Sequence, residues 1–393
     1  MKEMVTIDRL DDVGLRDLSR RTDTLGVLSV YLNADPQDPN LRGAAIDLRN
    51  RFAELQRRIS QDGAGYRGRD VALKLQRLWP QVESLLSPTA SGRGRIAFAA
   101  LGADWIVALE SAMPVPNRLV LDDGPFIHPL VELLDEGRPA GVTVVTAEEA
   151  RLLEWRLGEV TTVDRMQQGY VQAPHERAGQ IGGGPRGQFH TPVREQRESR
   201  ERDHTHRFLD DVSMRAAELA EKLGWERILV SGGERWTEAL ISRFPQSLRD
   251  KVVADPRFLH SLDDTALAAA VTEQLHKQHK DREKQLLAQV RDAAGSGLAA
   301  LGLSEVAAAL NAGRVAHLVY DPQVRYTGSV GVDDALYGGE EIAPGAQLSR
   351  PEPRLTERLV ERALNTAAQI TPIEGAAGGE LADAAGVAAL LRW

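Results

Sequence analysis

The sequence of 393 residues contains no cysteine, which excludes disulfide frameworks, thiolate zinc sites and cysteine nucleophiles. The same absence suits a reducing compartment. No stretch comes near the ~18–20 consecutive apolar residues that a membrane helix needs. The first fifteen residues carry acids from Glu3 onward and no apolar run, so they do not resemble a secretory signal. We therefore expect a cytoplasmic protein with no membrane partner.

An excess of positive charge is also missing, because the formal net charge is −9. A general nucleic-acid binder usually has a basic balance, so any RNA contact must come from local basic patches, and we expect no DNA partner. Solubility alone would also explain the acidic balance. Apolar residues make up 42% and charged residues 27%, as in globular proteins. At about 100–200 residues per domain, the length predicts two to four domains.

The first segment, residues 1–137, has the pattern of an α/β domain. Residues 25–32 form a β-rich apolar run, and a helix is predicted over 41–59. The polar face of that helix is either solvated or turned toward phosphate, and it carries Arg42, Arg49, Arg51, Arg57 and Arg58. Residues 95–101 and 105–109 predict a hairpin, and Gly137-Arg138-Pro139 is a plausible domain boundary.

The second segment, residues 138–292, begins with a predicted hairpin of strands 142–146 and 152–155. A long polar, glycine-rich loop is predicted over 167–202, because apolar periodicity is absent there. A helix is predicted from near His204 to Gly224, then a strand over 227–233, a helix over 236–243 and largely helical structure over 259–290. Alternating strands and helices favour a sheet with helices packed on it.

The third segment, residues 293–393, predicts a compact α/β/α unit. A helix capped by Ser304 and stopped by Gly313 leads into a strand over 315–320. A helix over 355–367, a strand over 370–373 and a final helix of small residues complete it. The fold class is therefore α/β, with three consecutive α/β domains whose mixed sheets are covered by helices.

The glycine-rich loop holds the candidate site. Its sequence over 182–188 is Gly-Gly-Gly-Pro-Arg-Gly-Gln, and glycine lets a backbone approach another molecule closely. It is not a phosphate-binding P-loop, because Lys-Ser/Thr does not follow, and it is not a dinucleotide fingerprint. One interpretation is a flexible exposed loop; the other is a mobile arm that presents polar and basic groups to RNA phosphate. The residues of that arm are Gly182, Gly183, Gly184, Arg186, Gly187, Gln188, His190, Arg194, Arg197 and Arg200.

Other polar motifs do not predict a metal site, a cofactor or a hydrolase triad. His204 and His206 form an HxH pair, but no obvious third ligand lies nearby. Ser231-Gly232-Gly233 lacks the G-x-S-x-G pattern of a nucleophile elbow. The adjacent acids at 148–149 and 263–264 lie at turns and helix starts, where acids favour the helix dipole.

The ordered set of elements resembles the archaeo-eukaryotic class I release factor and Pelota superfamily. In the middle segment the resemblance rests on the strand pair, a GGQ-type loop, an arginine-rich lead into a long helix, and a strand ending in Ser231-Gly232-Gly233. In the third segment it rests on the run from Gly302 to Val315, which precedes a hydrophobic strand. The resemblance covers about residues 139–393, and the bacterial Vms1-like and Balon-like hibernation factors, of the actinobacterial branch, are the most similar members.

The resemblance implies a translation factor that enters the ribosomal A site as a tRNA mimic. The ribosome, with its rRNA, is then the partner, and Balon-like relatives imply elongation factor Tu as a further one. In release factors the glutamine of the GGQ loop orients water on the peptidyl-tRNA ester. Here the matching triplet is Arg186-Gly187-Gln188, so a bulky arginine replaces the first glycine. A second Gly-Gln, at 179–180, lies farther from the helix, and nothing resembles a stop-codon-reading motif.

Three hypotheses follow. The first is a non-enzymatic factor that binds vacant or stalled ribosomes in hibernation or rescue. The second is a rescue enzyme that hydrolyses peptidyl-tRNA through Gln188 as its catalytic residue. The third is a nuclease or metal hydrolase, which the lack of a carboxylate–histidine cluster disfavours.

Overall fold

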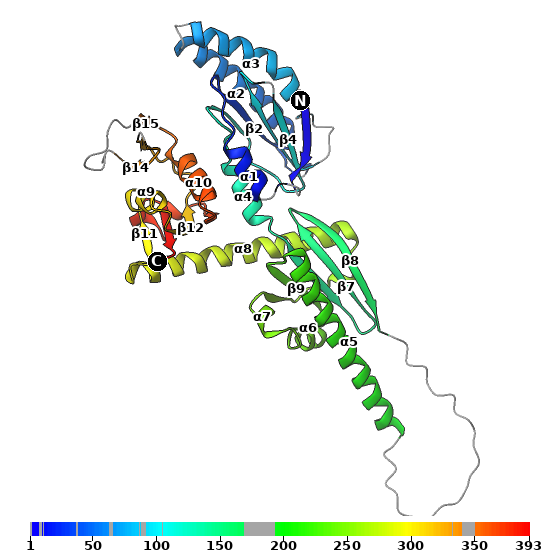
Figure 1. Cartoon of the computed structure of the whole chain (residues 1–393). Helices are drawn as coiled ribbons and strands as arrows, with labels where there is room; N and C mark the ends of the chain where they lie inside the picture. Colours follow the sequence, from blue (N-terminus) through cyan, green and yellow to red (C-terminus); the bar gives the residue numbers. More distant parts are fainter. Residues whose placement is uncertain are drawn as a thin grey trace, which may run out of the picture. The chain divides into compact units, whose positions relative to one another are not determined.

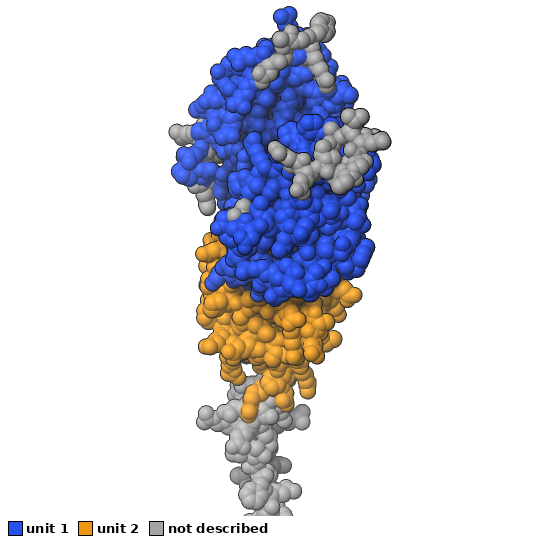
Figure 2. Space-filling view, turned by 90° about the vertical axis from the view of Figure 1, so that its left-hand side faces the viewer, with its two compact units in different colours: residues 1–137, 276–393 blue, residues 138–275 orange. Residues whose placement is uncertain are grey.

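The structure, a computed structural model, describes residues 2–7, 10, 12–36, 38–62, 66–85, 87, 92–103, 105–168, 193–331, 333–339 and 350–393. The chain divides into two compact units, which Figure 2 shows in different colours. Unit 1 comprises Met1–Gly137 and His276–Trp393, and unit 2 comprises Arg138–Leu275. The α/β fold class with mixed sheets is confirmed. The division into domains 1–137, 138–292 and 293–393 stays a prediction.

The N-terminal part of unit 1 is a five-stranded sheet of order β1-β4-β3-β2-β5. Its strands are β1 (Lys2–Thr6), β2 (Val27–Asn33), β3 (Gly94–Ala100), β4 (Ile106–Ser111) and β5 (Arg118–Asp122). β1 runs parallel to β4, and the other pairs are antiparallel. The strand predicted over 25–32 and the hairpin predicted over 95–109 are both confirmed.

Four helices accompany this sheet (Figure 1). They are α1 (Asp12–Ser19), α2 (Leu41–Asp62), α3 (Tyr66–Leu85) and α4 (His128–Glu136). α2 confirms the helix predicted over 41–59, and it packs Leu48 and Phe52 into one core with Leu75 of α3 and the buried side of β2. The predicted polar face of α2 carries the exposed Arg49, which pairs with Glu83 of α3. Among the described side chains, that face is therefore largely a network of surface ion pairs.

Unit 2 is built on a five-stranded sheet of order β10-β9-β6-β7-β8. Its strands are β6 (Ala140–Val145), β7 (Glu149–Arg156), β8 (Glu159–Gln167), β9 (Arg227–Gly232) and β10 (Val252–Asp255). β6, β9 and β10 run parallel, whereas β6–β7 and β7–β8 are antiparallel hairpins. The predicted β6–β7 hairpin is confirmed. β8 was not predicted, because it is an edge strand whose polar residues show no apolar alternation.

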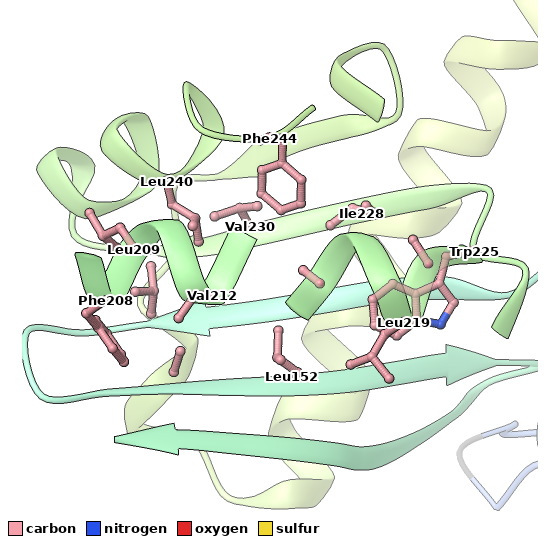
Figure 3. Packing of buried hydrophobic residues seen from close by; sticks show 14 residues of the cluster. Leu152, Phe208, Leu209, Val212, Leu219, Trp225, Ile228, Val230, Leu240 and Phe244 are labelled. Atoms are coloured by element: carbon pink, nitrogen blue, oxygen red, sulfur yellow. The ribbon is translucent and has the colours of Figure 1, made fainter. Parts of the chain in front are cut away.

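The helices of unit 2 are α5 (Val193–Leu223), α6 (Glu234–Ile241), α7 (Gln246–Arg249) and the 3₁₀ turn η2 (Leu259–Ser261). α8 (Asp264–Gly295) begins in unit 2 and ends in unit 1. α5 lies on one face of the sheet and packs Phe208, Val212 and Leu219 against Leu152 and Ile228 (Figure 3). Asp263 Oδ1 accepts the N–H of Ala266 at 2.8 Å, so this acid caps α8, as its position at a helix start predicts.

The start predicted for the long helix, near His204, is wrong, because α5 begins at Val193. Residues 193–202 are therefore helical, and they are not part of the loop predicted over 167–202. The misprediction has a physical cause. Among the described side chains of α5, Phe208 is the first apolar one that is buried, and the sequence before it has no apolar periodicity.

The C-terminal part of unit 1 holds two small sheets. One has the order β11-β17-β12-β16, with β11 (Ala299–Leu301), β12 (Val315–Tyr320), β16 (Gln369–Pro372) and β17 (Val387–Leu391). The other has the order β14-β13-β15, with β13 (Gly328–Val330), β14 (Leu336–Gly338) and β15 (Arg350–Glu352). Helices α9 (Leu303–Asn311) and α10 (Leu355–Asn365) and the 3₁₀ turns η3 (Ala376–Gly378) and η4 (Ala382–Ala384) complete this part.

Two local predictions for this part are wrong, and one is confirmed. The N-cap of α9 is Gly302 at φ +79°, one residue before the helix starts, so Ser304 does not cap it. The small residues at the chain end form 3₁₀ turns and the buried strand β17, because sheet burial overrides the helix propensity of alanine. Gly313 lies just past α9 at φ +67° and stops it as predicted. No helix in the described ranges has the length and apolar content to cross a bilayer.

Candidate functional site

Most of the predicted site residues lie outside the described residues. These are Gly182, Gly183, Gly184, Arg186, Gly187, Gln188 and His190, all within 169–192. Arg194, Arg197 and Arg200 lie on the first turns of α5, where the backbone is described. The roles assigned to these residues stay predictions, and the described part of the candidate site is the scaffold on either side of the loop.

The strand side of this scaffold ends at Gln168, directly after β8. The backbone N–H of Gln168 donates to the Glu148 carbonyl at 2.8 Å, and its side-chain amide lies 3.4 Å from Thr205 Oγ1 on α5. Thr146 Oγ1 stabilises the turn that contains Glu148, because it accepts a hydrogen bond from the N–H of Glu149 at 3.1 Å. The strand side of the loop is therefore anchored both to the β6–β7 turn and to α5.

The helix side of the scaffold extends well past this anchor. α5 begins at Val193, twelve residues before Thr205, and at 1.5 Å per residue these turns span about 18 Å. We call residues 193–207 the stalk. In Figure 1 the first turns of α5 project beyond the sheet of unit 2. The predicted glycine-rich loop therefore attaches to its body through one short strand anchor and one projecting helix.

The described side chains of the stalk, those of residues 202–207, lie outside the hydrophobic core of unit 2. No described residue between Arg202 and Arg207 is buried, and burial starts at Phe208. The stalk is rich in arginine, glutamate and glutamine, which have high helix propensity. Opposite charges three and four positions apart add about 0.2–0.5 kcal/mol per pair to an exposed helix. Local propensity, continued from the packed half of α5, accounts for a helix at this exposed position.

The packed half of α5 holds the stalk in a fixed direction. Phe208, Leu209 and Val212 are each at most 6% exposed in the core of unit 2 (Figure 3). Arg215 Nε donates to Asp164 Oδ2 of β8 at 2.7 Å, and this hydrogen bond lowers the pKa of Asp164 below its ordinary value. Because β8 and α5 flank the loop, this contact fixes the two flanks against each other.

Helical spacing sorts the charges of the stalk by side. Positions 197, 200, 204 and 207 follow one another at intervals of three, four and three residues, so they share one side of the helix. We call Arg197, Arg200, His204 and Arg207 the basic stripe. Glu195, Glu198 and Arg202 belong to the opposite flank, whereas Asp203 borders the stripe, three residues after Arg200 and four before Arg207. The sequence alone does not reveal this stripe, because helical periodicity can be applied only once the helix is known to start at Val193.

The described residues contain no group of three or more His, Asp or Glu side chains that could hold a metal ion. The HxH pair of His204 and His206 lies within α5, where residues two apart diverge by about 200° around the axis. The two imidazoles therefore cannot converge on one ion while the helix persists. The basic stripe is therefore the remaining candidate feature of this scaffold.

Comparisons with known proteins find one family model and several solved structures to which this chain is similar. The family model "Bacterial archaeo-eukaryotic release factor family 10" matches residues 125–280. A search of curated proteins finds no match. The chain is similar to the archaeal translation termination factor aRF1, at 16% identity over 99% of both chains with a TM-score of 0.25. It is also similar to Pelota of Archaeoglobus fulgidus, at 15% identity over 76% of this chain and 79% of that one, with a TM-score of 0.33.

A third similar structure is Dom34 of S. cerevisiae, at 10% identity over 79% of this chain and 78% of that one, with a TM-score of 0.40. The family match spans α4, the whole of unit 2 and the first half of α8. It does not assign the Vms1-like or Balon-like branch. Over residues 125–280, the chain is similar to the bacterial archaeo-eukaryotic release factors described by this family model.

Proposed function

We propose that the protein is a translation factor that binds the ribosomal A site in hibernation or rescue and does not read stop codons. The observation that carries the proposal is the projecting stalk, on the segment that matches the family model. The stalk presents a basic stripe on a chain whose net charge is −9. A local row of arginines is the feature that an acidic protein needs in order to contact RNA phosphate. Ribosomal RNA is the proposed ligand, and elongation factor Tu is a further partner to be tested.

The architecture also suits a finger that enters a narrow channel. An exposed single helix about 10–12 Å across with its side chains can carry a loop away from the body of a domain. The described anchors at Gln168 and Arg215 would hold the base of that finger while its end reaches outward. The proposal therefore assigns positioning to β8 and α5, and contact with RNA to the stripe and the loop.

The test of this assignment is the salt dependence of ribosome binding. Each phosphate neutralised contributes about 0.7–0.9 to the slope of log K against log salt concentration. Replacing Arg197, Arg200 and Arg207 together by glutamine should therefore weaken binding and reduce the slope by about 2–3. A matched control replaces three arginines outside α5, Arg235, Arg249 and Arg291, which changes the net charge equally. An unchanged slope in the stripe variant, or an equal loss in the control, would remove the stalk from the RNA contact.

The hydrolytic alternative through Gln188 is decided by a separate assay. Ribosome complexes that carry peptidyl-tRNA in the P site are incubated with the purified protein, and released peptide is measured. With arginine at position 186 in place of glycine, we expect no release above background. Release that disappears in the Gln188→Ala variant would instead establish a rescue enzyme, and the non-enzymatic part of the proposal would be withdrawn.

A further inference from the structure

Unit 1 contains a buried polar cluster that the proposed function does not use. His128, the first residue of α4, is 7% exposed, and its Nδ1 lies 2.8 Å from the hydroxyl of Tyr320 at the end of β12. Its Nε2 lies 3.7 Å from Oε1 of Glu357, in the first turn of α10. The Phe126 ring meets the imidazole edge-on at a centroid distance of 5.2 Å. His128 therefore hydrogen-bonds α4 to β12 and brings it close to α10.

The hydrogen-bond roles at His128 follow from its protonation state. Burial, and then the charge of Arg118, lower the pKa of His128 to about 4, so the ring is neutral at pH 7. Burial raises the pKa of Tyr320 well above its ordinary value, so its hydroxyl keeps its proton and donates to Nδ1. The proton of the neutral ring is then on Nε2, the nitrogen that faces Glu357.

Two carboxyl groups in this region ionise near neutral pH. One turn along α4 from His128, Glu132 has no hydrogen-bond or ion-pair partner among the described residues. Burial, and then the charge of Glu374, raise the pKa of Glu132 to about 7. Burial also raises the pKa of Glu357 to about 7, and its side chain is only 12% exposed. Both groups therefore gain or lose a proton within the physiological range.

The surrounding charges explain why neither carboxyl is held in its charged form. Five carboxyl groups face the cluster from the elements around it: Asp122, Asp135, Glu136, Glu352 and Glu374. The cations that face it are Arg118, Lys280, Arg282 and Arg354. Most of the cations already pair elsewhere: Lys280 with Glu283, Arg282 with Asp135, and Arg354 with Asp122. On α8, His276 is occupied by Glu136 at 2.6 Å and His279 by Glu283 at 3.2 Å.

We propose that His128, Glu132, Tyr320 and Glu357 form a proton-controlled clasp that holds α4 against the C-terminal part of unit 1. The clasp is closed most firmly when both carboxyl groups are protonated and His128 is neutral. Loss of the two protons leaves buried negative charge that forms no ion pair with the surrounding arginines and lysine, which favours release of α4 into solvent. This inference is independent of ribosome binding, because it concerns packing within unit 1.

The direction of the pH effect follows from the pKa of each group in the closed and released states. Glu132 and Glu357 have pKa values of about 7 when closed and the ordinary 4.5 when released, so closing takes up two protons as the pH falls below 7. The pKa of His128 is about 4 in the closed state and 6.5 in the released state, so protonation of this histidine opposes closing of the clasp below pH 6.5. The effect of the two carboxyl groups on the closing equilibrium is larger than the opposite effect of the single histidine. Between pH 8 and pH 6 the closing equilibrium should rise about twentyfold.

Hydrogen exchange of the α4 amides in the full-length protein tests the clasp, with rates corrected for the intrinsic effect of pH. The protection factors should be about twentyfold higher at pH 6 than at pH 8. Glutamine imitates a protonated glutamate, so the Glu132→Gln/Glu357→Gln variant should be strongly protected already at pH 8. Its protection should then fall about fourfold at pH 6, because only His128 still titrates. In each single variant, Glu132→Gln or Glu357→Gln, the protection factor should rise only about twofold from pH 8 to pH 6.

The matched control is Glu380→Gln, which removes one exposed carboxylate from the same unit. It should follow the wild-type protein at both pH values. Equal protection of wild-type α4 at pH 6 and pH 8 would overturn the proposal. A double variant that retains the full rise between pH 8 and pH 6 would do the same, since other groups would then control the packing of α4.

Discussion

The replacement Gly141→Ala is a strong test of the packing in unit 2. Gly141 lies in the buried strand β6, and Trp225, 1% exposed, covers it. A Cβ atom at position 141 would lie 2.1 Å from Cε3 and 2.4 Å from Cζ3 of the Trp225 indole. Ordinary carbon–carbon contacts are about 3.5–4.0 Å, so the ring would have to move by more than an ångström within a filled core. Glycine is therefore required here by the approach of an aromatic ring.

The expected cost follows from the effect of overpacking. Overpacking costs about 1–3 kcal/mol, and the rigid ring puts this site at the upper end. The lower backbone entropy of alanine in the unfolded chain returns about 0.5–1 kcal/mol. We therefore expect a net loss of about 2 kcal/mol in the free energy of unfolding of unit 2. Urea titration followed by tryptophan fluorescence and by hydrogen exchange of β6 and β9 measures it.

A double-mutant cycle separates this clash from other effects. In a Trp225→Leu background the same Gly141→Ala replacement should cost less than about 0.5 kcal/mol, because the ring is gone. Gly43→Ala is the control: it lies in helix α2 with no atom within 4 Å of the added Cβ, and it should be neutral or slightly stabilising. An equal cost of Gly141→Ala in both backgrounds would refute the reasoning.

Two further predictions concern buried carboxylates. Arg257 donates from Nη2 to Asp255 Oδ2 at 2.7 Å, and the Asp255 side chain is fully buried, so Arg257→Met should cost unit 2 about 3 kcal/mol in a urea titration. A loss below about 1 kcal/mol would contradict the pairing. At Asp23, burial acts to raise the pKa, but four backbone N–H groups, including those of Leu25 and Ala103, bring it below the ordinary 3.8. The stabilisation by Asp23 is therefore fully present above pH 3.8 and is lost as the pH falls through the lowered pKa. The stability gap between wild-type and Asp23→Ala protein should accordingly narrow under acid, and a gap that is constant with pH would contradict this account.

The sequence predicts those strands and helices whose buried apolar residues recur at a regular spacing along the chain. The run 27–33, the hairpin at 94–111 and the β6–β7 pair are apolar on the side that packs, so periodicity locates them. β8 and the stalk have no such pattern, because the residues of the edge strand are largely exposed and the sequence of the stalk is almost entirely polar. β17 has the opposite problem, since its alanines suit a helix until the neighbouring strands β11 and β12 bury them.

For the candidate site as well, the sequence predicts local features, whereas the contacts between distant residues require the structure. The sequence picked out Arg194, Arg197 and Arg200 by composition, but it could not show which of them share a helix side. The helix side of each arginine can be assigned only because α5 starts at Val193. The same helical spacing then adds His204 and Arg207 to the stripe. The anchors of the scaffold, Gln168 to Thr205 and Asp164 to Arg215, join residues 37 and 51 positions apart in the chain. Contacts at that separation depend on the fold and leave no local signal.

The most direct test of the central claim is the binding of the intact protein to purified ribosomes whose A site is either vacant or filled with tRNA. The proposal predicts saturable binding to vacant ribosomes, weaker at higher salt and abolished when tRNA occupies the A site. Failure to bind vacant ribosomes, or binding that is indifferent to A-site tRNA, would contradict it.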